Sequence, residues 1–146
     1  MNVSNPKSMD AKILEWSLLA GAIYFACVAL AHTIGFKVPG LFIYFNVPSQ
    51  PYQDQLIGVL ALGWAALFFV ASVDPVSQPA PSIALLFVSA AAVLGLSRIN
   101  ALTDFNSLSP NITTPVFWVQ VGILFCYLVW LVIFFYRSRH PHHEQQ

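Results

Sequence analysis

Long hydrophobic runs alternate with shorter polar and proline-rich stretches along this chain. Four runs contain no Asp, Glu, Lys or Arg, and they cover residues 16–36, 55–73, 76–97 and 112–136. Each run reaches roughly the 20 apolar residues that an α-helix needs to cross the hydrocarbon core of a bilayer. The pattern predicts an all-α polytopic membrane protein, folded as an antiparallel bundle of four transmembrane helices.

Turn-forming and capping residues set the expected ends of these helices. Gly35 ends the first helix, Asp54 suits the positive end of the second helix, and Pro115 suits a first helical turn. We expect helices at about 11–34, 54–72, 81–101 and 115–137. The four segments account for most of the chain, which predicts a single domain, residues 1–146, with a short polar C-terminal tail at 138–146.

Small and polar residues follow one face of two of these helices. In the first helix they are Ser17, Gly21, Tyr24, Val28 and His32. In the fourth helix, heptad spacing places on one face Gln120, Tyr127 and Phe134. Lipid offers polar groups no hydrogen-bond partner, so the face of the first helix is expected to pack against other helices.

The stretch between the first two runs, residues 32–55, is too interrupted by proline and glycine to form another helix. It contains His32, Lys37, Asp54 and several aromatic residues beside the membrane. We expect residues 38–50 to lie at headgroup depth, because their apolar run would be unfavourable in water. If the protein has a functional site, we expect this stretch to form one side of it.

Composition narrows the classes of partner. The chain of 146 residues is 58% hydrophobic and 8% charged, with a net charge of zero. A soluble domain carries about 25% charged residues, and a nucleic-acid-binding protein carries a basic patch. The expected partners are therefore the lipid bilayer and other membrane protein subunits or a second copy, with no nucleic acid. Cys27 and Cys126 are interpreted as two small buried hydrophobic residues.

Basic residues near the helix ends predict the orientation. Lys7, Lys12, Arg137 and Arg139 lie on the side of the termini, against Lys37 and Arg98 on the other. Because four basic residues lie on the side of the termini and two on the other, we predict an integral membrane protein with the N- and C-termini inside. In size and four-helix organisation the chain resembles small bacterial inner-membrane families such as the DoxX-like proteins. A bacterial inner membrane is the expected location.

Nearly all of the remaining polar functional groups lie on the predicted outer side. They form a candidate polar cluster of His32, Asp54, Arg98 and Asp104. Ionisable residues at membrane depth are costly and often functional. Because Arg98 ends a charge-free run and is always charged, we predict an ion pair from Arg98 to Asp54 or Asp104, with Asp54 favoured.

His32 is the candidate for cofactor binding. A haem held by two histidines needs a second intramembrane His, which the sequence lacks, so a single-His pigment site or a quinone site remains as an alternative. His32, Asp54 and Asp104 have the ligand types of a facial metal triad, but no spacing motif supports one. No cofactor and no metal is predicted.

Two functions remain open from the sequence. The large apolar helix surface favours a non-catalytic accessory or stabilising subunit of a larger membrane complex, and thus no enzyme. The alternative is a small membrane enzyme or carrier that acts on a lipid-soluble substrate, such as a quinone, through the outer-side polar cluster. The two differ in whether His32, Asp54 and Arg98 converge on a cavity.

Overall fold

The computed structural model describes residues 8–39, 42–109 and 112–140. It contains four long helices, α1 (Met9–Thr33), α2 (Pro51–Val73), α3 (Pro79–Leu102) and α4 (Thr114–Arg139), and a short 3-10 helix, η1 (Phe105–Ser107). Each long helix is long and apolar enough to cross a membrane. The predicted fold class, an all-α bundle of four transmembrane helices, is confirmed.

Each helix begins one to three residues earlier than predicted. Pro51 and Pro79 are the first residues of α2 and α3, where the missing backbone N–H of proline costs nothing. At the other end of the chain, α4 continues to Arg139 and so includes the first two residues of the predicted polar tail. His140 follows it, and residues 141–146 of that tail lie outside the described residues.

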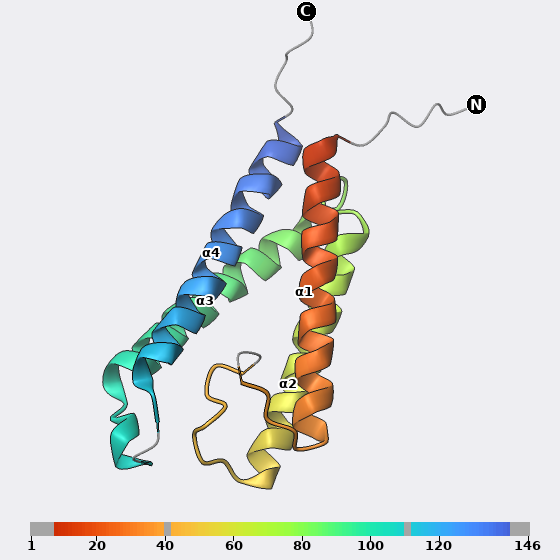
Figure 1. Cartoon of the computed structure of the whole chain (residues 1–146). Helices are drawn as coiled ribbons and strands as arrows, with labels where there is room; N and C mark the ends of the chain where they lie inside the picture. The colour runs from red at the N-terminus through yellow and green to blue at the C-terminus, as the bar shows by residue number, and fades with distance from the viewer. Residues whose placement is uncertain (1–7, 40–41, 110–111, 141–146) are drawn as a thin grey trace, which may run out of the picture.

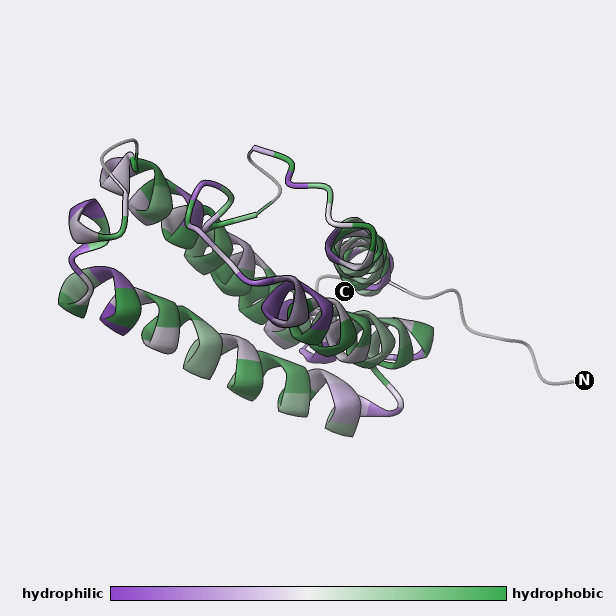
Figure 2. Cartoon of the chain, turned by 90° about the horizontal axis from the view of Figure 1, so that it is seen from below, coloured by the Kyte–Doolittle hydropathy of each residue, from purple (hydrophilic) through white to green (hydrophobic). Residues whose placement is uncertain are grey.

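The first two helices form an antiparallel hairpin, and α4 lies beside α1 (Figure 1). The start of α1 and the end of α4 meet at one end of the bundle, where Arg137 Nε donates a hydrogen bond of 3.2 Å to Asp10 Oδ2. In contrast, α3 runs obliquely. Its C-terminal end lies beside η1 and the start of α4, away from the start of α2 (Figures 1 and 2).

The small-polar face of α1 packs against other helices, as predicted. Tyr127 Oη donates a hydrogen bond of 2.6 Å to the Ser17 carbonyl, and Trp130 Nε1 donates one of 3.0 Å to Ser17 Oγ. At Gly21, a Cβ atom would lie 2.5 Å from the ring of Phe68 in α2. Glycine is therefore required there for α2 and α4 to approach α1 this closely.

Hydrophobic residues cover most of the helix lengths, and hydrophilic residues gather towards the ends and loops (Figure 2). Cys27 and Cys126 are free and exposed on the surfaces of α1 and α4. The predicted burial of these two residues is wrong. A thiol is only weakly polar, so cysteine is tolerated on a helix face that lipid covers.

The close contact at Gly21 generates a stability prediction. Gly21→Ala should destabilise the bundle by about 1–3 kcal/mol, because the added methyl group overpacks against Phe68. Thermal unfolding in mild detergent measures this. Gly122→Ala is the matched control, since an added Cβ there meets nothing within 4 Å; it should be neutral or slightly stabilising. Equal stability of the two variants would contradict the prediction.

Candidate functional site

The segment between α1 and α2, here called the linker (residues 34–50), folds back onto the helices. Phe42 is buried, and its ring centroid lies 4.2 Å from that of His32 in α1. The Phe42 carbonyl accepts a hydrogen bond of 3.1 Å from the buried Gln120 Nε2 of α4. Non-helical backbone near membrane depth is tolerated where protein groups satisfy it, as they do here. Residues 40 and 41 lie outside the described part of the linker.

Tyr44 joins the linker to the other half of the bundle. Its ring stacks on Phe105 of η1, with 5.4 Å between centroids, and meets Phe117 of α4 edge-on at 5.0 Å. Its hydroxyl donates a hydrogen bond of 2.7 Å to Asn100 Oδ1 at the end of α3. Burial raises the pKa of the Tyr44 phenol, which keeps this hydroxyl protonated and able to donate.

Four polar side chains form a continuous network where the linker enters α2. Lys37 Nζ donates a hydrogen bond of 2.6 Å to Ser49 Oγ. Ser49 Oγ donates in turn to both oxygens of Asp54, at 3.0 and 2.9 Å. On the other side, His32 Nδ1 lies 3.4 Å from Asp54 Oδ1 and forms an ion pair whenever the imidazole is protonated. The network thus connects α1, the linker and α2.

A close approach of α1 and α2 brings His32 and Asp54 together. Gly58 lies one turn after Asp54, and a Cβ atom there would be 3.1 Å from Thr33 Oγ1 and 3.2 Å from the Ala29 carbonyl. The absence of a side chain at Gly58 lets the two helices meet at this level. The side chains of His32 and Asp54 are only 11% and 14% exposed as a result.

The other two members of the predicted cluster lie elsewhere. Arg98 is exposed on α3 and makes no ion pair within the described part of the chain. Asp104 is exposed, and its Oδ1 accepts a hydrogen bond of 3.2 Å from the Asn106 N–H, which caps η1. Asp54 therefore meets His32 rather than Arg98. Arg98 belongs to the C-terminal part of α3. The oblique path of α3 takes that end of the helix away from the start of α2, although both ends lie towards the same end of the bundle (Figure 1).

The site also includes residues that the sequence did not single out for it. The linker contributes Ser49 and Phe42 to the site. The linker also forms hydrogen bonds with Gln120 of α4 and Asn100 of α3. For Gln120 the sequence showed only a heptad spacing with Tyr127 and Phe134, from which no contact was predicted. No three His, Cys, Asp or Glu side chains among the described residues come together as a metal site.

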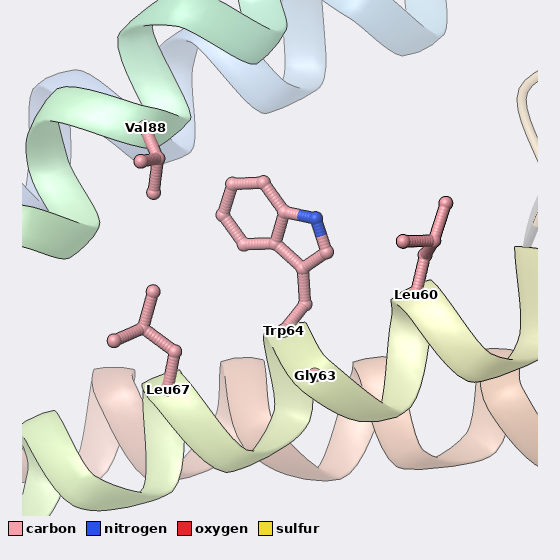
Figure 3. Close-up of a pocket in the computed structure, with 5 residues that line it drawn as sticks. All are labelled: Leu60, Gly63, Trp64, Leu67 and Val88. Carbon is pink, nitrogen blue, oxygen red and sulfur yellow. The ribbon is translucent and has the colours of Figure 1, made fainter.

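The structure also has an apolar groove between α2 and α3. Its volume is about 250 Å³, and its lining consists of Leu60, Gly63, Trp64, Leu67 and Val88. Figure 3 shows the Trp64 side chain extending from α2 between these residues, with Val88 facing it from α3. This groove lies along the helices and away from the polar network, so its chemistry is apolar.

Comparisons with protein-family models, with curated proteins and with solved structures found no match to this chain. Its function therefore has to be inferred from the geometry described above. That geometry establishes a small membrane protein with four apolar helices.

The polar network generates a prediction for the linker. Asp54→Asn removes the charge that accepts hydrogen bonds from Ser49 and faces His32, which should cost about 1–3 kcal/mol. We expect the linker to loosen, so that chymotrypsin cleaves after Tyr44 or Phe45 in proteoliposomes, whereas the unmodified protein resists. Mass spectrometry locates the cut.

Asp104→Asn is the matched control, because that carboxylate caps only η1. It should leave the linker resistant. Cleavage of the unmodified protein between 41 and 45 would contradict both the network and the predicted placement of residues 38–50 at headgroup depth.

Proposed function

We propose that this protein is a non-catalytic accessory or stabilising subunit of a larger membrane complex. The observation that carries the proposal is the contrast between its polar groups and its helix surface. The polar side chains at the linker end are engaged with one another, and they fasten the linker to the helices. The apolar surface of α3 is, in contrast, left largely uncovered.

The exposure of α3 supports this proposal. The buried residues of this helix are Ser82, Leu85 and Asn100. Large side chains such as Phe87 and Leu94 are 76% and 72% exposed. A helix that contributes so little to its own bundle retains surface for packing against other transmembrane helices, for which small residues and shape complementarity matter most.

A second candidate function follows from the His32–Asp54 contact. An imidazole beside a carboxylate is suited to exchanging a proton with a lipid-soluble substrate such as a quinone. The ring of Phe42 lies against His32, and both polar side chains are mostly buried, so a substrate would have to displace the linker. We therefore place this function second.

Gentle detergent extraction distinguishes the two functions. We expect the chain to migrate on a native gel with at least one other polypeptide in fixed stoichiometry, identified by mass spectrometry. Deleting the chain should lower the amount of that polypeptide in the membrane. A chain that migrates alone, with extractable quinone or a visible pigment spectrum, would instead support the second function.

We also propose that both termini lie inside, in a bacterial inner membrane, because basic residues favour that side four to two. Alkaline phosphatase fused after Gln146 should be inactive, and a cytoplasmic fluorescent reporter at the same position should be active. A matched fusion placed after Asn106, in the connection before α4, should show the opposite pattern. Reversal of both results would overturn the orientation.

A further inference from the structure

One face of α3 combines small residues, large apolar residues and a charge, and nothing in the described chain covers it. Heptad spacing aligns Ala84, Ala91 and Arg98, and the intervening positions add Phe87, Leu94 and Gly95. All six residues are exposed. Residues spaced in this way form a continuous seam along a helix, the arrangement through which transmembrane helices pack.

Gly95 has no role in the internal packing of the chain. A Cβ atom added there would meet nothing within 4 Å, whereas at Gly21 and Gly58 it would meet neighbouring helices. Glycine in a helix interior is less favourable than alanine, and the absence of a side chain at Gly95 would let a neighbouring helix approach this face closely. With Ala91, Gly95 forms a small-xxx-small pair that permits such an approach.

Arg98 indicates which chemical group a helix packed on this seam should carry. It is exposed at the end of the seam, and it has no ion pair within the described residues. The carboxylates at this end are engaged, since Asp54 contacts His32 and Ser49 and Asp104 caps η1. A second copy packed in parallel would place Arg98 against Arg98. A complementary partner must therefore supply a carboxylate.

We propose that this α3 face is the docking surface for a transmembrane helix of a different subunit, which carries small residues opposite Ala91 and Gly95 and an Asp or Glu level with Arg98. The proposal rests on the proposed function as a subunit and specifies its partner.

A synthetic transmembrane peptide tests the recognition directly. The probe is a Leu/Ala helix with a small-residue seam and one Glu near the Arg98 end, and energy transfer to the purified, labelled protein in liposomes reports binding. Replacing the Glu by Gln should weaken binding about tenfold. Arg98→Glu should abolish the preference for Glu and create a preference for a Lys-bearing peptide.

Bulky substitutions test whether the peptide binds at the seam or elsewhere on the helix surface. Ala91→Leu should weaken binding of the Glu peptide, whereas Ala66→Leu, at an exposed position on α2, should not. Equal binding of the Glu and Gln peptides would overturn the proposal and show that Arg98 reaches lipid phosphates instead. Energy transfer between two copies of the chain, lost in Ala91→Leu, would overturn it in favour of self-association.

A photo-crosslinking residue distinguishes failure of this surface from failure of the proposed function. It is placed at Ala91 or, as control, at Gly122, which has an equally open position on α4. The proposal requires the stoichiometric partner to be crosslinked from Ala91. If a native complex exists but only Gly122 crosslinks to it, the docking surface is wrong and the subunit function stands. If no complex exists, both are wrong.

Discussion

The carboxylate of Asp54 is the group on which the arrangement of this protein depends. A charge near the hydrocarbon boundary is costly unless partners compensate it. Here Ser49 and His32 do so, and Ser49 in turn fixes Lys37. These contacts turn the linker back towards the bundle. Because the linker returns, its Phe42 carbonyl pairs with the Gln120 amide of α4 and its Tyr44 hydroxyl pairs with the Asn100 amide of α3, and these bonds hold the linker to both helices at this end.

The features that could be predicted from the sequence are those that depend on short stretches of chain. Helix number follows from the length of apolar runs, and the inward face of α1 follows from the spacing of Ser17, Gly21 and His32. His32 and Asp54 could be selected as site candidates because they are ionisable residues at the ends of adjacent spans. Their contact with each other was not predicted, because Asp54 was expected to pair with Arg98.

The partners of individual side chains could not be predicted in the same way. Arg98 and Asp54 lie near the same end of the bundle, and the short connection between α2 and α3 suggested that they would meet. Whether they meet depends on the crossing angle of α3, which is set by packing along the whole helix. The hydrogen bond from Gln120 to the Phe42 carbonyl likewise spans two segments far apart in sequence, and it depends on the path of the linker.

The helical glycines look alike in the sequence, but the structure shows that their packing environments differ. At Gly21 an added Cβ atom would collide with the Phe68 ring of α2, and at Gly58 it would lie tightly against Thr33 and the Ala29 carbonyl of α1. Gly95 is free of such contacts, as are Gly63 and Gly122, yet of these three only Gly95 lies in a seam that also contains Ala91 and ends in Arg98. The internal glycines therefore explain how α1 and α2 pack so closely. A glycine without an internal contact then becomes informative only when a second feature, here the charge of Arg98, lies on the same face.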